Sequence, residues 1–92
     1  MQTQIAKELQ LPIFHLNGNN PKALGQQYFN ALMALDEFQD KFFAIEFHAR
    51  DYYPLGDEAW LKAKTQWETQ KANMASLRDF LDVHTSHCFQ AR

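Results

Sequence analysis

The sequence predicts an all-α protein: a long antiparallel helical hairpin with an extended N-terminal arm, forming a helical bundle by oligomerisation. Two long segments repeat apolar residues at alternating spacings of three and four, which is typical of helices with one apolar stripe. Between them, Pro54 and Gly56 mark the only place where the chain can turn back. Several phenylalanines lie outside both stripes, and a single hairpin cannot cover them.

The first helix is predicted over residues 20–49. Asn20 and Pro21 are typical of an N-cap and a first helical residue. The stripe is Leu24, Tyr28, Ala31, Leu35, Phe38, Phe42, Ile45 and Ala49, an unbroken coiled-coil pattern.

A turn over residues 50–56 and a second helix over residues 57–88, with Asp57 as its N-cap, complete the hairpin. The second stripe is Trp60, Ala63, Trp67, Gln70, Met74, Leu77, Leu81, His84 and Cys88, in which Gln70 and His84 are polar. Because the turn is short, the helices must be antiparallel.

Residues 1–19 are predicted to form an arm. Ile5–Leu9 can make one helical turn that Pro12 ends, and an extended stretch to Leu16 follows, with Ile13 or Phe14 in contact with the core. The residues from Asn17 to Asn20 are typical of a turn. This arm is too short to cover the phenylalanines outside the stripes, so a two-fold dimer that forms a four-helix bundle is expected. The predicted interface residues are Phe29, Phe43, Phe47 and Phe80.

Composition favours one small globular domain of 92 residues with a formal charge of −2, which disfavours nucleic acid as a partner. Cys88 is the only cysteine, and no apolar run is long enough to cross a membrane. The N-terminal residues lack the apolar run of a signal peptide. The expected location is therefore the cytoplasm.

Two short motifs carry a family resemblance. Ile13-Phe14-His15-Leu16-Asn17-Gly18 precedes the first helix, and Ala49-Arg50-Asp51-Tyr52-Tyr53-Pro54 lies in the turn. With the two helices, these motifs resemble a group of short helical-hairpin proteins of tailed phages and prophages. The resemblance implies a phage or prophage setting, hence the interior of a host cell, and a helical hairpin. It implies no activity.

The turn is the best candidate for a ligand site, because His48, Arg50, Tyr52 and Tyr53 combine positive charge with aromatic faces. We favour the simpler interpretation that Arg50 bonds the last carbonyls of the first helix while the tyrosines plug the end of the bundle. In an antiparallel dimer, the turn of one copy could meet the residues before the first helix of the other, including Asn17 and Asn19. Such a composite pocket would suit a nucleotide-type anion.

A metal site is a further hypothesis. His84, His87 and Cys88 share one face of the second helix, and antiparallel packing brings them near His15. We favour a frayed C-terminus and a buried cysteine over zinc, because the spacing matches no known zinc signature.

We find no cofactor motif and no catalytic arrangement, so the protein is predicted not to be an enzyme. The leading hypothesis is a phage or prophage accessory protein that binds itself and a host or phage protein, as a structural adaptor or as an inhibitor of a host protein. The alternative is an oligomeric protein that binds or sequesters a small nucleotide-type anion.

Overall fold

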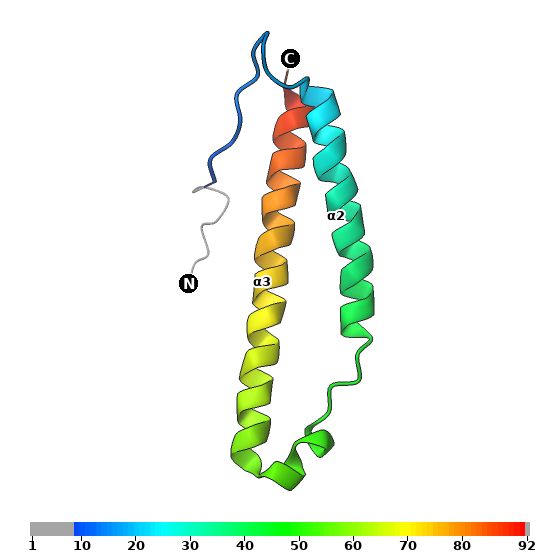
Figure 1. Ribbon diagram of the computed structural model, residues 1–92, viewed down its shortest axis with the longest axis vertical. Coiled ribbons are helices and arrows are strands. Elements are labelled where there is room, and N and C mark those ends of the chain that lie inside the picture. Colours follow the sequence, from blue (N-terminus) through cyan, green and yellow to red (C-terminus); the bar gives the residue numbers. More distant parts are fainter. Residues whose placement is uncertain (1–8, 92) are drawn as a thin grey trace.

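The computed structural model describes residues 9–91 and consists of two long helices that lie side by side (Figure 1). Helix α2 (Pro21–Phe43) runs away from the arm, and helix α3 (Asp57–Gln90) returns antiparallel to it. Two short 3-10 turns, η1 (Ala49–Asp51) and η2 (Tyr53–Leu55), lie between them, and the described residues contain no strand. The molecule measures 61 × 26 × 17 Å. The predicted helical hairpin is confirmed.

The start of α2 forms as the sequence predicts. The backbone of Asn20 is extended, and its side-chain oxygen accepts a hydrogen bond of 3.0 Å from the Ala23 amide. Pro21 is the first helical residue, where its missing amide hydrogen costs nothing.

Helix α2 ends at Phe43, whereas the sequence predicted a helix to residue 49. The chain unwinds after Ala44, and the Phe47 ring stacks on Trp67, with centroids 4.3 Å apart and planes 5° apart. The connection therefore spans residues 44–56 and not only the predicted 50–56.

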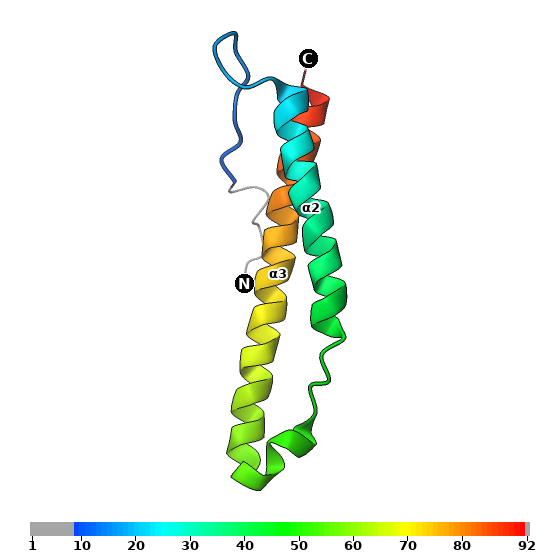
Figure 2. The same cartoon turned by 45° about the vertical axis from the view of Figure 1, so that its right-hand side comes forward.

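Helix α3 is 34 residues long and α2 only 23, so the connection accompanies the first turns of α3 (Figure 2). Gly56 holds the N-cap position, with a φ of 104° that favours glycine. Asp57 is the first helical residue and not the predicted cap. With Glu58 it places negative charge in the first turn, where the helix dipole favours it. The helix ends at Gln90, two residues beyond the predicted end at 88.

The helices meet along only part of the predicted coiled-coil stripe of α2. Tyr28 packs on His84 and Phe42 packs on Trp67, whereas Ala31 is exposed and Phe38 is 52% exposed. The buried residues of α2 are Gly25 and Leu32, so the contact is rotated towards them by less than one residue, or less than roughly 100°. Gly25 explains part of this rotation, because a side chain there would collide with α3: an ideal Cβ would lie 2.9 Å from the Cβ of Cys88.

On α3 the predicted stripe is buried at Met74, His84 and Cys88. Leu77, on the same stripe, remains 49% exposed and lines a groove together with Phe38. The inter-helix contact of the described chain is therefore small, and Leu32, Met74 and Cys88 are its buried apolar side chains.

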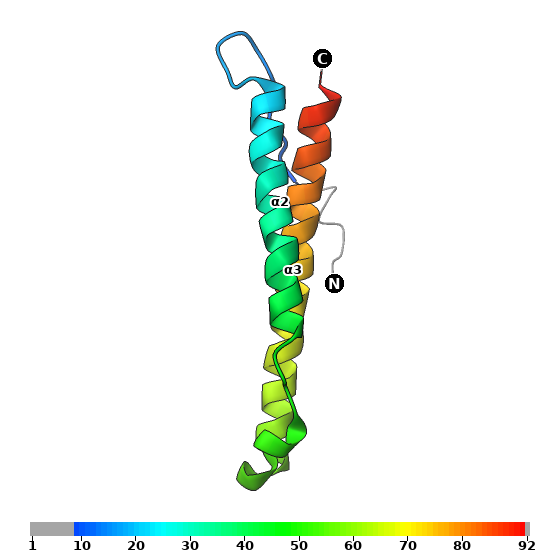
Figure 3. The same ribbon diagram turned by 90° about the vertical axis from the view of Figure 1, so that its right-hand side faces the viewer.

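The described part of the arm lies beside the C-terminal end of α3 (Figures 1 and 3). Phe14 stacks on His87 at 5.7 Å, and Nε2 of His87 lies 2.7 Å from the carbonyl oxygen of Pro12. Phe14 is thus the arm residue that contacts the helices, whereas Ile13 is 84% exposed. The predicted helical turn Ile5–Leu9, except for Leu9 itself, and the residues before it lie outside the described residues. In the described chain, neither helix is long and apolar enough to span a membrane.

Candidate functional site

The four candidate ligand-binding residues of the connection do not form one site. His48 and Arg50 are exposed, and Tyr53 is largely exposed as well. Tyr52 turns inward and packs on Phe47 at 5.7 Å and on Trp60 at 5.9 Å. Only Tyr52 therefore acts as the predicted plug. Since α2 ends at Phe43, Arg50 lies beyond the last turn of that helix, whose carbonyls it was predicted to bond.

A row of stacked rings holds the connection against α3. Trp67 lies between Phe42 of α2 and Phe47 of the connection, with centroids at 4.5 and 4.3 Å. Phe47 also contacts Trp60 at 5.1 Å. Both tryptophans are therefore structural anchors, as their place on the stripe predicts. We refer to Phe42, Phe47, Tyr52, Trp60 and Trp67 as the aromatic cluster.

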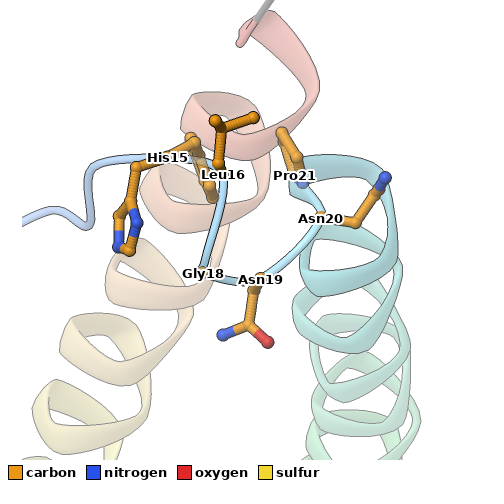
Figure 4. Close-up of a pocket in the computed structure, with 7 residues that line it drawn as sticks. His15, Leu16, Gly18, Asn19, Asn20 and Pro21 are labelled. Atoms are coloured by element: carbon orange, nitrogen blue, oxygen red, sulfur yellow. The ribbon is translucent and has the colours of Figure 1, made fainter.

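Asn17 and Asn19 lie at the opposite end of the hairpin, in the loop that leads into α2 (Figure 4). An open hollow there is lined by Phe14, His15, Leu16, Gly18, Asn19, Asn20 and Pro21. The Gly18 amide donates to the carbonyl of His15 at 3.1 Å, and a side chain at Gly18 would meet the His15 ring. The two halves of the predicted anion site are thus at opposite ends of one chain.

The four candidate metal ligands do not come together. Nδ1 of His84 lies 2.9 Å from the Phe80 carbonyl, so it donates to that oxygen, and the ring lies between Phe80 and Tyr28. Nε2 of His87 is bonded to the arm, and His15 lies over Gly18. Within residues 9–91, no three histidine, cysteine or acidic side chains are grouped to hold a metal ion. Cys88 is completely buried, and burial raises the pKa of its thiol, which makes the thiolate harder to form.

Two of the four predicted interface phenylalanines are exposed, and the other two pack within the hairpin. Phe29 and Phe43 are exposed, at 38% and 54%, and so are available to a partner. Phe47 belongs to the aromatic cluster, and Phe80 stacks on His84 at 4.1 Å. These two rings are thus occupied within the hairpin.

An ion pair between Asp36 and Arg78 joins the two helices. Nε and a terminal nitrogen of Arg78 donate to the two carboxylate oxygens at 2.8 and 3.2 Å. The hydrogen bonds from Arg78 lower the pKa of the Asp36 carboxyl, and those same bonds raise the pKa of the guanidinium. Asp36 is not part of the predicted stripe of α2, so the stripe gives no indication of this pair. Asp36 lies eleven residues, or about three helical turns, after Gly25, so both residues share one face of α2. That position predicts a contact with α3 only once the face of Gly25 is known to be the contact face.

An apolar groove lies between the helices. Its upper part, about 180 Å³ in volume, is lined by Phe38, Phe42, Gln70, Asn73, Met74 and Leu77. Its lower part shares Phe42 and Gln70 and continues past Ala63, Gln66 and Trp67 to Phe47 and Tyr52. None of these lining residues is an acid, a lysine, an arginine or a histidine, so the groove suits an apolar or amide-bearing surface.

Comparisons of the chain with protein-family models, with curated proteins and with solved structures found no match.

Proposed function

We propose that this protein works by binding other proteins, as a structural adaptor or as an inhibitor of a host protein, in a tailed phage or prophage. It performs no chemistry of its own in this proposal. The two motifs that resemble phage helical-hairpin proteins support the setting, and the surface of the hairpin supports the mode of action.

The observation that carries the proposal is the mismatch between buried and exposed apolar surface. Among the apolar side chains of the helices and the connection, those with more than half of their surface exposed include Phe38, Phe43, Ile45 and Leu61. Between 38% and 49% is exposed at Phe29, Met33, Phe89 and Leu77. A two-helix protein with so little buried core gains stability when a partner covers this surface.

One patch is suited to a partner protein. Phe29 and Met33 lie one turn apart on α2, and Phe89 of α3 lies beside Gly25, one turn before Phe29. We call these three side chains the outer patch. The ion pair of Asp36 and Arg78 lies one turn beyond it, so the patch has an apolar centre and a charged rim, as interfaces commonly do.

The alternative, binding of a nucleotide-type anion, requires two copies placed antiparallel. Its donors lie at opposite ends of a molecule 61 Å long. Tyr52, one of its two stacking rings, is already packed on Phe47 and Trp60. The geometry therefore favours protein binding.

The test is a pull-down from bacterial host lysate with tagged wild-type protein and the variant Phe29→Ser. We expect the wild type to recover one protein in stoichiometric amount, and Phe29→Ser to recover at least about tenfold less of it, as for loss of a central interface side chain. Asn30→Ser is the matched control, because Asn30 is the exposed neighbour on another side of α2. A wild-type bait that recovers no stoichiometric partner contradicts the proposed function. Equal loss with both variants contradicts the role of the outer patch.

A further inference from the structure

A second stripe of residues runs along α3, on the side away from α2. Met74 is buried where it lines the groove with α2, and Ala72 and Val83 lie roughly 160–180° round α3 from it. The members of this stripe recur at spacings of 4, 3, 4, 4, 3 and 4, which keep them in line on a helix. We call them the far stripe: Thr65, Thr69, Ala72, Ser76, Phe80, Val83 and His87.

The described arm lies on the C-terminal part of the far stripe. Nε2 of His87 lies 2.7 Å from the carbonyl oxygen of Pro12, and the Phe14 ring stacks on the His87 ring. Val83, about one turn before His87, is half-buried although α2 lies on the opposite side. From Phe14 back to Leu9 the arm runs beside α3 towards its N-terminal half (Figures 1 and 3). The chain that precedes Leu9 is therefore aimed along the rest of the far stripe.

The N-terminal part of the far stripe borders a hollow. Three small, exposed residues of the stripe lie in it, namely Thr65, Thr69 and Ala72. The Thr69 hydroxyl donates to the Thr65 carbonyl at 3.0 Å, so this polar group is satisfied within the helix. The Glu68 carboxylate, at the edge, pairs with Lys71 at 3.5 Å. The hollow can therefore receive an apolar side chain between small neighbours. Its complete lining is Leu61, Lys64, Thr65, Glu68, Thr69 and Ala72.

The length of chain before the arm matches the distance to this hollow. Ile5 precedes Pro12 by seven residues, which span about 23 Å as extended backbone. Ala72 precedes His87 by fifteen residues, which span about 22 Å of α3. Because Pro12 is bonded to His87, the two distances start from the same point. An extended chain thus brings Ile5 to the level of Ala72.

The alternation of the arm turns Ile5 towards α3. Leu9 and Leu11 are half-buried, and Gln10 between them is exposed. Side chains of an extended chain point alternately to opposite sides. Continued towards the N-terminus, this alternation places Ile5 on the side of Leu9 and Ala6 on the exposed side.

A charge on the far side of α3 fits the same path. Asp79 is half-buried beside the far stripe and has no ion-pair partner within residues 9–91. It lies about 12 Å along α3 from His87, whereas Lys7 is about 16 Å of extended chain from Pro12. Lys7 shares the inward side with Ile5 and Leu9, and its long side chain covers the remaining distance. The segment therefore brings a positive charge to an acidic neighbour.

We propose that residues 1–8, which lie outside the described residues, form a strap along the far stripe, with Ile5 in the hollow at Thr69 and Ala72. This path requires extended backbone in place of the helical turn that the sequence predicts for Ile5–Leu9. A helical turn would carry Ile5 only about 6 Å past Leu9, to the level of Ser76. The strap leaves the outer patch free, since Phe89 lies roughly 120° round α3 from Val83, and it does not depend on the proposed function.

The test is disulfide formation under mild oxidation in dilute, full-length protein. The pair Ile5→Cys and Ala72→Cys is compared with Ile5→Cys and Asn73→Cys, because Asn73 is the exposed neighbour roughly 100° round α3. Cys88 is completely buried and stays in place. We expect the first pair to form a disulfide within one chain at least about tenfold faster than the second, because cysteines must lie close together to be bridged.

Three results would overturn the proposal. Equal rates for the two pairs would show that Ile5 does not lie in the hollow. Faster bridging of Ile5→Cys to Ser76→Cys than to Ala72→Cys would show the helical turn instead. A disulfide that forms mainly between two chains, resolved on a non-reducing gel, would assign the hollow to a second copy.

Thermal unfolding followed by circular dichroism gives an independent readout. Ile5→Asp should lower the melting midpoint by about 5 °C or more, because it removes a buried apolar side chain. Ala6→Asp is the control, since it places the same charge on the outward side and should leave the midpoint nearly unchanged. Equal midpoints for both variants would contradict the strap. If Ala72→Asp then abolished capture of a host protein in the pull-down, the hollow would belong to that partner.

Discussion

Replacing Gly25 with valine is expected to separate the two helices at the end where the chain enters α2. An ideal Cβ at this position lies 2.9 Å from the Cβ of Cys88 and 3.2 Å from two atoms of the Phe89 ring. The Phe89 ring is half-exposed and can move, but the Cβ of Cys88 is fixed to the backbone of α3. We expect Gly25→Val to lower the free energy of unfolding by about 3 kcal/mol, which in a chain with so little core removes most of its stability. Chemical denaturation followed by circular dichroism measures this loss.

A double-mutant cycle separates the collision from other effects. Gly25→Ala gains about 1 kcal/mol of helix propensity, which offsets part of its steric cost. Combining it with Cys88→Gly removes the opposing Cβ, so the two substitutions should cost less together than the sum of their separate costs. Cys88→Ala is the control, since it keeps the Cβ and should give no such relief. Additive costs in both pairs would show that Gly25 is not a point of close approach.

Replacing Trp67 with alanine is expected to release the connection from α3. The Trp67 ring is stacked between Phe42 and Phe47, and no other side chain of the aromatic cluster contacts both. We expect a loss of about 3 kcal/mol, the lower end for removal of a large aromatic side chain, because Trp67 is only half-buried. Hydrogen exchange should then become faster in residues 44–56, with α3 beyond Met74 less affected.

Two controls make this result specific. Trp60→Ala removes contacts with Phe47 and Tyr52 but leaves Phe42 on Trp67, so it should cost less and loosen only the connection. Leu61→Ala changes an exposed residue on the same helix and should have little effect. If Trp67→Ala cost no more than Leu61→Ala, or if exchange in residues 44–56 did not change, the aromatic cluster would not hold the connection.

The features of the fold that the sequence predicted correctly depend on local chemistry. The helix start at Asn20 and Pro21 and the return at Gly56 follow from capping and backbone preference, which act within a few residues. The end of α2 could not be predicted in this way. The stripe continues through Ile45 and Ala49, but the helix ends at Phe43, and Phe47 of the connection stacks on Trp67, a contact between residues that are distant in the sequence.

The rotation of α2 had the same kind of cause. Helical spacing fits both the predicted stripe of α2 and a contact face rotated towards Gly25 and Leu32. Which face meets α3 depends on the close approach of Gly25 to Cys88 and on the ion pair of Asp36 with Arg78. This rotation decided which residues became surface. It left Phe38 and Leu77 exposed, whereas the sequence had assigned both to the contact between the helices and had placed the interface at Phe29, Phe43, Phe47 and Phe80.

We propose, as the sequence predicts, that this hairpin is stabilised by self-association, and thermal unfolding of the wild type at different concentrations tests this proposal most directly. Melting followed by circular dichroism between about 1 and 100 μM should show a midpoint that rises with protein concentration, because a partner that binds only the folded chain shifts unfolding by mass action. A midpoint that is the same at all concentrations would show that the single hairpin is stable alone, and would contradict the account.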